Sequence, residues 1–533
     1  MSVNVKKSTW AIALSLACSA TGLAQWSSDA NVNTPIAVKS GEQVQSKVRA
    51  TADGGCYIAW YDNETGGYDM YIQRLDPQGY KLFPPAGLQV ADLSFSSTQD
   101  YGFGVDGADH AYLAFRDDRY AGQQVTANVI APDGTLVWGS AGVQLADSMN
   151  GNAPHLAATS TGVVVGWTLS PPVRLQKLDA AGVPLWGAGI VEQPSGSYTY
   201  TLCELQPSED GGVIASWVRG GGYTTPRHLY TQKYDAAGNR LWNGGSPRVV
   251  FDGGSLQLGY FPTFSTDGNG GAVFSWYDTG GSRHAYVQHI DAAGSEAFPH
   301  NGVTVNTTAN RIRLVPSHAH NPITGDTFVF WTETNSGQSQ WGVYGQQITA
   351  AGARGWGVGG LQVTALDGQQ EAFVNTLSFL DGAQVFWFDN SGIGRVLGAR
   401  VSAAGTFLWI PPIIQPCSLL SDKSRLDATC TPSGTALLTW GDGRSDARDV
   451  YAQNVNPPDG SLGLPIFLHA DLNCDGVVDF DDINPFVLAI SDPGAYETQY
   501  PDCFWLAGDC DSDCDVDFDD INAFVALLSS GAP

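Results

Sequence analysis

A turn sequence that recurs along most of the chain constrains the fold more than any other feature. Its clearest copies read YTQKYDAAGNRLW from Tyr230, YVQHIDAAGSEA from Tyr286 and YGQQITAAGARGW from Tyr344. Five weaker copies begin at Tyr71, Ala127, Leu175, Leu397 and Tyr451. Successive turn glycines lie 48 to 58 residues apart: Gly79, Gly134, Gly182, Gly238, Gly294, Gly352, Gly405 and Gly460. Glycine supplies the positive φ that a tight hairpin requires, so each copy predicts a hairpin.

Each repeat unit also contains an apolar strand that ends in an aromatic residue. These aromatics recur every 50 to 59 residues: Trp60, Phe115, Trp167, Trp217, Trp276, Trp331, Trp387 and Trp440. With the turn and a last strand such as GVQLAD, a unit holds four short strands, the signature of a β-propeller blade. One such sheet cannot bury both of its faces alone. We therefore expect the blades to stack, with the aromatic side chains between them.

The two ends of the repeat array complement each other. The last unit loses its Trp and final strand near Gly460–Leu464, whereas Trp26–Val38 resembles the missing piece. We predict that this N-terminal segment supplies the outer strand of the last blade, which removes an open sheet edge. The expected fold is mainly β, with an eight-bladed propeller over residues 25–466. Seven blades are the alternative, because the third unit is short.

Composition and charge exclude several classes of partner. The 533 residues include 64 glycines and only 15% charged residues, which suits many short strands and tight turns. The formal net charge is −27. Nucleic acids and anionic membranes both require a basic face, so neither is an expected partner. An acidic surface of this kind is typical of an extracellular protein, including those that use divalent cations.

Residues 1–24 have the pattern of a secretory signal peptide. Lys6 and Lys7 precede the apolar run Trp10–Ala17, and small residues end the segment before Gln25. The run is too short to span a bilayer, and no other apolar run approaches that length. A lipoprotein signal ending at Cys18 is the alternative. We expect the mature chain to be secreted or displayed at the cell surface.

Eight cysteines remain after the predicted cleavage, and an even number in an oxidising compartment usually indicates disulfides. Cys417 and Cys430 are close in sequence and are a plausible pair. The partners of the other cysteines in the repeat region, Cys56 and Cys203, are left open.

The repeat region contains no catalytic motif that we can identify. It has no His-Glu-x-x-His metalloprotease motif, no Gly-x-Ser-x-Gly nucleophile elbow and no phosphate loop. His318 and His320 form an H-x-H pair, for which a metal site and a polar loop pair are both possible. Acids recur just after the second-strand aromatic: Asp62, Asp117, Asp118, Asp278 and Asp389. Either they line one mouth of the ring, or they bond their own turns, which we favour. The Trp residues are expected in the core before any role as sugar platforms.

Two acidic segments near the C-terminus predict calcium loops. DLNCDGVVDFDD begins at Asp471 and DCDSDCDVDFDD begins 38 residues later at Asp509. Oxygen ligands at positions 1, 3, 5, 7, 9 and 12 of a twelve-residue loop can surround one Ca²⁺ ion. From Asp471 onward the chain has fifteen Asp and Glu and no Lys or Arg, so cations are needed to offset the repulsion. The predicted ligands are Asp471, Asn473, Asp475, the Val477 carbonyl, Asp479 and Asp482, and then Asp509, Asp511, Asp513, the Asp515 carbonyl, Asp517 and Asp520.

These residues resemble a type I dockerin, a module with two loop–helix repeats. The resemblance covers about the last 63 residues of a domain that we place at 467–533. It rests on Asp at loop position 12, an apolar Val478 or Val516 at position 8, and the helix starts INPFVLAI and INAFVALL. It implies a small α-helical, EF-hand-like domain that folds around two calcium ions and docks to a cohesin-type partner. In that family Phe480-Asp481, Phe518-Asp519 and the helices after them would contact the partner.

Three features depart from the family. Cys514 replaces the turn glycine of the second loop, the connection Ser491–Gly508 is long, and the cysteines are additional. We expect Cys474 and Cys503 to form a disulfide that pins this connection.

The sequence therefore predicts an exported calcium-binding protein whose propeller presents a binding surface and whose tail mediates docking. The alternative is a carbohydrate-active enzyme, a glycoside hydrolase or a polysaccharide lyase, acting on a polysaccharide. A purely structural surface protein is the third possibility.

Overall fold

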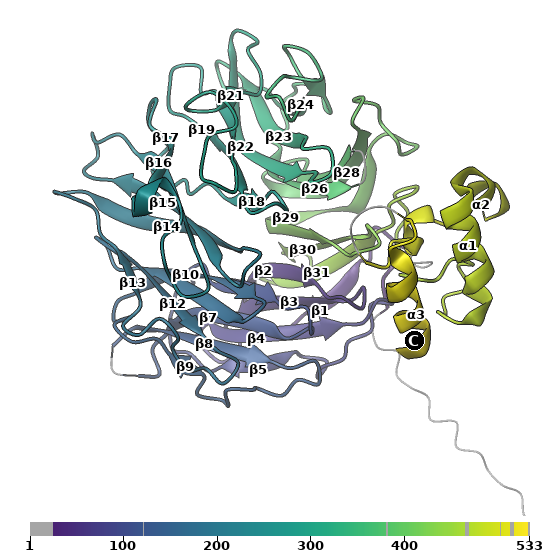
Figure 1. The fold of residues 1–533 in the computed structure, drawn as a ribbon, viewed down its shortest axis with the longest axis horizontal. Coiled ribbons are helices and arrows are strands. Elements are labelled where there is room, and N and C mark those ends of the chain that lie inside the picture. Colours follow the sequence, from purple (N-terminus) through teal and green to yellow (C-terminus); the bar gives the residue numbers. More distant parts are fainter. Residues whose placement is uncertain are drawn as a thin grey trace, which may run out of the picture.

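A ring of small antiparallel sheets makes up most of the molecule, and short helices follow it (Figure 1). The computed structural model describes residues 25–120, 122–379, 382–463, 468–500, 503–511 and 516–530. The predicted signal peptide 1–24 and the predicted domain boundary at 466 and 467 lie outside these residues. No described helix has the length and apolar character needed to cross a membrane.

Six sheets contain four strands each, paired in the order of the sequence. The first three sheets are β2 (Gln43–Ala50), β3 (Cys56–Asp62), β4 (Asp69–Leu75) and β5 (Leu88–Ala91), then β6 (Gly102–Val105), β7 (Ala111–Asp117), β8 (Gln124–Ile130) and β9 (Val143–Gln144), then β10 (Asn152–Thr159), β11 (Gly162–Thr168), β12 (Val173–Leu178) and β13 (Ile190–Glu192).

The next three sheets repeat this pattern. They are β14 (Thr199–Pro207), β15 (Val213–Gly220), β16 (His228–Tyr234) and β17 (Arg248–Phe251), then β18 (Phe264–Thr266), β19 (Ala272–Tyr277), β20 (Ala285–Ile290) and β21 (Val303–Thr304), then β22 (Arg311–His320), β23 (Thr327–Asn335), β24 (Trp341–Ile348) and β25 (Leu361–Gln362). A short 3₁₀ turn, η1 (Asn243–Gly245), precedes β17.

The last sheet has seven strands because β29 is shared between two four-stranded groups. The first part of β29, from Ile414 to Lys423, pairs with β28, and its second part, from Lys423 to Cys430, pairs with β30. The strand order is β1-β31-β30-β29-β28-β27-β26. These strands are β26 (Ala372–Phe379), β27 (Gly382–Phe388), β28 (Gly392–Ser402), β29 (Ile414–Cys430), β30 (Ala436–Asp442), β31 (Asp449–Val455) and β1 (Thr34–Ala37).

The first strand of each group contacts the first strand of the next, and β29 contacts β2, so the ring is closed. This arrangement is a β-propeller. The second-strand aromatics are buried between the sheets, as predicted. Each of the following is at most 2% exposed: Trp60, Phe115, Trp167, Trp217, Trp276, Trp331, Trp387 and Trp440. All eight predicted turn glycines have positive φ, between 76° and 87°.

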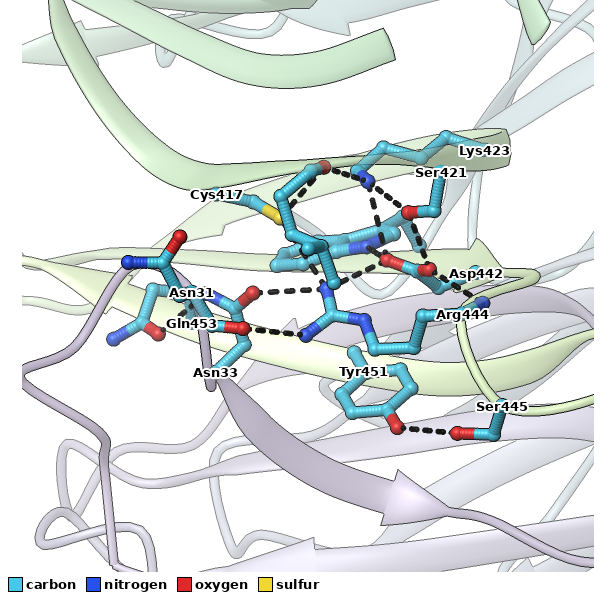
Figure 2. Close-up of polar contacts among 12 residues, drawn as sticks. Asn31, Asn33, Cys417, Ser421, Lys423, Asp442, Arg444, Ser445, Tyr451 and Gln453 are labelled. Atoms are coloured by element: carbon cyan, nitrogen blue, oxygen red, sulfur yellow. Dashed lines mark hydrogen bonds and ion pairs between the residues drawn. The ribbon is translucent and has the colours of Figure 1, made fainter. Parts of the chain in front are cut away.

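The N-terminal strand closes the ring, as the sequence predicts. Residues Thr34 and Pro35 of β1 pair with Ala452 and Tyr451 of β31. Arg444 fastens this junction: its guanidinium donates to the Val32 carbonyl oxygen (2.9 Å) and to Asn33 Oδ1 (3.0 Å). Figure 2 shows the guanidinium between the N-terminal segment and the last sheet.

The same junction contains a buried cluster of charges. Asp442 Oδ2 lies 2.6 Å from Arg444 Nη2 and 3.2 Å from Lys423 Nζ (Figure 2). The Trp440 indole N–H donates to the same carboxylate at 2.8 Å, and Ser421 Oγ donates at 2.6 Å. Burial alone would raise the pKa of Asp442, but Arg444 and Lys423 hold that pKa below its usual value.

The C-terminal segment contains three short α-helices and two further 3₁₀ turns. The helices that follow the two acidic segments are present, and α2 lies in the connection between them, where the sequence predicted no helix. The elements are η2 (Phe480–Asp482), α1 (Ile483–Ser491), α2 (Pro493–Gln499), η3 (Trp505–Gly508) and α3 (Asp520–Ser530).

The disulfide predictions have mixed outcomes. Cys474 and Cys503 are bonded, which pins the connection as expected. The predicted pair Cys417–Cys430 is wrong. These residues lie near opposite ends of β29, and thirteen strand residues span roughly 40 Å, whereas bridged Cα atoms lie about 5.5–6 Å apart. Cys417 is a buried thiol whose Sγ lies 3.2 Å from Arg444 Nη2.

Candidate metal centre

The first predicted calcium loop, residues 471–482, is organised by the carboxylate at its last position. Asp482 Oδ1 accepts hydrogen bonds from the backbone N–H of Leu472 (2.8 Å) and Asn473 (3.0 Å). Its Oδ2 accepts from the N–H of Asp479 at 2.9 Å. A single buried side chain therefore ties the start of the loop to its end.

The first position of this loop sits at its centre. Asp471 Oδ2 accepts from the N–H of Gly476 (2.9 Å), whose φ of 86° makes the predicted sharp turn. The remaining predicted side-chain ligands line the same loop, and each accepts a backbone N–H two residues ahead: Asn473 from Asp475, Asp475 from Val477, and Asp479 from Asp481.

The second loop, which begins at Asp509, repeats these contacts. Asp520 Oδ1 accepts from the N–H of Cys510 (2.6 Å) and Asp511 (3.0 Å), and its Oδ2 accepts from Asp517 (2.8 Å). Carboxylate oxygens of Asp509, Asp511 and Asp520 all lie within 4.8 Å of one another. The predicted ligands Asp513 and Asp515, and Cys514, lie outside the described residues.

The electrostatics of the first loop favour a bound cation. The pKa of Asp471 is raised to about 6, chiefly by burial and also by the nearby carboxylates of Asp482 and Asp475. Burial also raises the pKa of Asp482, to which Asp475 adds repulsion. Buried carboxylates are usually paired with cations or metals, and this segment offers no Lys or Arg.

The donor set fits calcium. The described candidates are carboxylate, amide and backbone oxygens, which are the hard ligands that Ca²⁺ takes at about 2.3–2.6 Å. Two oxygens on opposite sides of one such ion are then about 4.6–5.2 Å apart, which matches the span of the Asp509, Asp511 and Asp520 oxygens. Bound at either loop, calcium supplies the positive charge that the segment lacks.

A shared apolar core holds the two loops together. Val478 and Val516, at position 8 of each loop, are 5% and 4% exposed. The rings of Phe486 on α1 and Phe524 on α3 stack at 3.9 Å between centroids. Tyr496 of α2 donates its hydroxyl to the Leu472 carbonyl oxygen at 2.9 Å. The extra helix therefore supports the entry to the first loop.

Outside this core, the two repeats expose matching apolar side chains. Phe480 and Phe518 are 77% and 74% exposed, at positions 38 residues apart in the sequence. Two further pairs of side chains, also 38 residues apart, have matching exposed fractions. Ile483 and Ile521 are 38% and 40% exposed, and Val487 and Val525 are 57% and 52% exposed. Sequence reasoning identified the two Phe residues, whereas the Ile and Val partners on α1 and α3 emerge from their exposure.

The C-terminal segment touches the ring at Phe379, the last residue of β26. The Phe379 ring stacks on Phe504 at 5.5 Å, and Phe379 belongs to the same apolar cluster as Val478 and Phe486. A cavity of about 480 Å³ lies beside this contact. Turns after the first strands line it, including Thr51 and residues Ser378–Phe379, together with Asp509 of the second loop.

Four of the five predicted loop acids of the ring bond their own turns, as the sequence favoured. The Asp278 carboxylate accepts from the N–H of His284 (2.9 Å), and Asp389 accepts from the N–H of Arg395 (2.7 Å). Asp62 accepts from Glu64 and Asp117 from Arg119 in the same way, whereas Asp118 accepts from Ser94 of the preceding unit, so the prediction is wrong for Asp118.

The histidine pair is also engaged inside the fold. His318 bonds the hydroxyls of Ser275 (2.7 Å) and Ser265 (3.2 Å), and His320 bonds Thr327 (3.0 Å). Burial lowers the pKa of both imidazoles to about 4. Among the described residues, three metal-type ligands converge only at Asp509, Asp511 and Asp520, so the pair is not part of a metal cluster.

Comparison with known proteins finds only distant structural similarity. No protein-family model and no curated protein matches the chain. A solved eukaryotic initiation factor is 10% identical with a TM-score of 0.42, covering 83% of this chain and 96% of that chain. An ulvan lyase, a polysaccharide lyase bound to an oligosaccharide, is 9% identical with a TM-score of 0.44, covering 82% and 97%. The Dos1 propeller is 13% identical with a TM-score of 0.43, covering 77% and 95%. The fold of this chain therefore rests on its own strand pairing.

Proposed function

We propose that the C-terminal segment binds two calcium ions and, folded around them, docks this secreted protein to a partner, while the ring presents a binding surface. We also infer that the ring has eight blades, with β29 shared by the last two. The observation that carries the calcium proposal is the convergence of Asp509, Asp511 and Asp520 within 4.8 Å in a segment without basic residues.

Calcium titration of the full chain tests the first part. After treatment with EDTA, isothermal titration is expected to give two ions per chain, and circular dichroism is expected to gain helical signal. The variant Asp471→Asn/Asp482→Asn should bind one ion, and so should Asp509→Asn/Asp520→Asn. The control Asp210→Asn/Asp446→Asn removes two exposed acids of the ring and should still bind two. Failure of wild type to bind calcium would reject the proposal.

Support for docking comes from the matched apolar side chains of the two repeats. A dockerin-like module with two equivalent faces should bind a cohesin-type partner through either face. With a panel of cohesin modules as probes, Phe480→Ser/Val487→Ser and Phe518→Ser/Val525→Ser should each retain binding. The variant that combines all four substitutions should lose it. Binding that survives all four would place the interface elsewhere.

The carbohydrate-active alternative is tested on the same protein by the release of new reducing ends from acidic and neutral polysaccharides.

A further inference from the structure

A second candidate site lies inside the ring, away from the calcium loops. A cavity of about 140 Å³ opens among β2, β26 and β29 and the residues that lead into β6. Pockets for drug-sized ligands measure about 300–1,000 Å³, so this one has room for a single small ring or group. The side chains that matter for the argument are Gln45, Lys47, Asp100, Phe373, Arg425 and Asp427.

The backbone at this cavity is held in an unfavourable conformation. Gln45, Phe373 and Arg425 have φ of 57°, 54° and 56°, a region that non-glycine residues rarely adopt. Each lies at a β-bulge where the register with the second strand shifts. Such positions cost about 1–3 kcal/mol each and cluster at functional sites. The same bulge with positive φ recurs at Ala153 on β10 and Val315 on β22, so it belongs to the repeat, and this cavity is distinguished by the side chains that its bulges carry.

A β-bulge changes the direction of the side chains on its strand, and here two hydrogen bonds hold the bulges of two strands in place. Asn375 Nδ2 donates to the carbonyl oxygens of Phe373 (2.9 Å) and Leu426 (3.0 Å), which joins the bulges of β26 and β29. The Phe373 ring packs edge-on against buried Phe388 at 5.6 Å between centroids and remains 42% exposed. A positioned aromatic surface therefore borders the cavity.

Two cations, Lys47 and Arg425, and two carboxylates, Asp100 and Asp427, line the cavity, and all except Arg425 have an ion-pair partner. Lys47 pairs with Asp100 at 2.7 Å, and the Asp427 carboxylate accepts from Arg49 at 3.1 Å. Arg425 is exposed and has no ion pair or hydrogen bond with any described residue. One guanidinium thus stands uncompensated in a chain whose net charge is −27. Arginine presents a planar fork that matches a carboxylate.

We propose that this cavity binds an acidic sugar residue, a uronate, with its carboxylate on Arg425 and an apolar ring face on Phe373. The hydroxyl groups of the sugar meet Gln45, Lys47, Asp100 and Asp427, which supply both donors and acceptors. This deepens the proposed function, since it names a ligand for the binding surface of the ring. It does not depend on the calcium loops.

Binding of D-glucuronate and D-glucose to the full chain, with calcium present throughout, tests the proposal. Saturation-transfer NMR and isothermal titration should show glucuronate binding at least tenfold more tightly than glucose. The variant Arg425→Gln should remove this preference, and Phe373→Gly should weaken both sugars while relieving backbone strain. Higher salt should weaken glucuronate more than glucose.

A matched control separates ligand contact from strain. Val315 lies at the same kind of bulge on β22, with φ of 46°, but does not line the cavity. Val315→Gly should therefore raise stability and leave glucuronate binding unchanged. Equal binding of the two sugars, or unchanged glucuronate binding by Arg425→Gln, would overturn the proposal. The double variant Asp471→Asn/Asp482→Asn should bind glucuronate as wild type does. The calcium proposal and the sugar proposal can therefore fail independently of each other.

Discussion

The closing sheet and the C-terminal loops both contain buried carboxylates, but they differ in what neutralises them. At the closing sheet the chain itself supplies the cations, since Lys423 and Arg444 flank Asp442 and hold its pKa low. In the first loop, Asp471 and Asp482 are buried without a basic residue, and burial raises both pKa values. The closing sheet is neutralised by its own side chains, whereas we propose that the first loop needs a bound cation.

The largest expected effect is a loss of stability caused by a substitution at the closing sheet. Arg444→Ala removes one of two cations from Asp442 and the hydrogen bonds to the N-terminal segment. Asp442 then keeps only Lys423 as a cation, and the acceptors on Val32 and Asn33 lose their donor, so unfolding should become easier by about 3 kcal/mol. Calorimetry should show the same loss with calcium and with EDTA.

A second arginine on the same sheet provides the control. Arg448 pairs with Asp422 at 3.1 Å where both side chains are well exposed. Exposed pairs contribute about 0–1 kcal/mol, so Arg448→Ala should have little effect. A loss as large as that of Arg444→Ala would mean that burial does not distinguish the two pairs.

The next effect concerns the C-terminal segment alone. The disulfide between Cys474 and Cys503 spans 29 residues, and in the chain-entropy account its removal costs about 3 kcal/mol. Cys474→Ser/Cys503→Ser should lower the calcium-free melting temperature of the helical signal. The β-sheet transition should stay where it is, and a shift in both transitions would show that the two regions unfold together.

A smaller effect is expected at Asp475, where one substitution should be favourable without calcium and unfavourable with it. Asp475 repels Asp471 and Asp482, so Asp475→Asn should stabilise the calcium-free segment, by less than about 1 kcal/mol. In calcium the same change replaces a charged ligand with a neutral amide oxygen, and affinity should fall about tenfold, or about 1.4 kcal/mol. Asn473→Asp should do the reverse in both conditions. Equal signs with and without calcium would contradict a metal role for this loop.

The last expected effect is a pH slope within the ring. Glu371 is buried, and its carboxylate accepts a hydrogen bond from the Thr364 hydroxyl. The acids Asp367 and Asp389 lie near it, and Asp389 is itself paired with Arg395. Burial raises the pKa of Glu371 to about 7 from an ordinary 4.5. A raised carboxyl pKa favours the protonated folded state, so stability should fall as pH rises from about 4.5 to 7. Glu371→Gln should flatten this slope in urea unfolding, and an unchanged slope would assign it to another group.

The sequence predicted the features that repeat, together with the Cys474–Cys503 disulfide, and missed several others that occur once. The turn glycines, the buried Trp residues and the closing strand all follow from periodic patterns. The sequence pattern did not indicate that the last two units share one strand, β29. Because Cys417 and Cys430 both lie on this strand, they are close in sequence but far apart in space. Nearness in sequence is not nearness in space along an extended strand.

The candidate sites divide in the same way. The acidic loops indicate their chemistry through spacing, and the carboxylates of Asp509, Asp511 and Asp520 do converge, while calcium binding itself stays a prediction. Arg425 and Phe373 carry no local signal, because positive φ is typical of glycine and not of these residue types. Only the bulges that bring three strands together reveal them. Helix α2 was missed because its side chains serve the first loop rather than a repeat.

The closing strand also sets the order in which this protein can mature. Arg444 and Asn33, which meet at the junction, are separated by 411 residues, so β1 is synthesised first and its partner strand β31 among the last. Contacts of such long range are slow to form, because chain closure must precede them. Until then the first strand is an exposed edge that invites pairing with other chains. We therefore expect the ring to gain its resistance to unfolding only when β1 pairs with β31. A chaperone or additive that prevents the N-terminal strand from pairing with other chains should increase the yield of refolding.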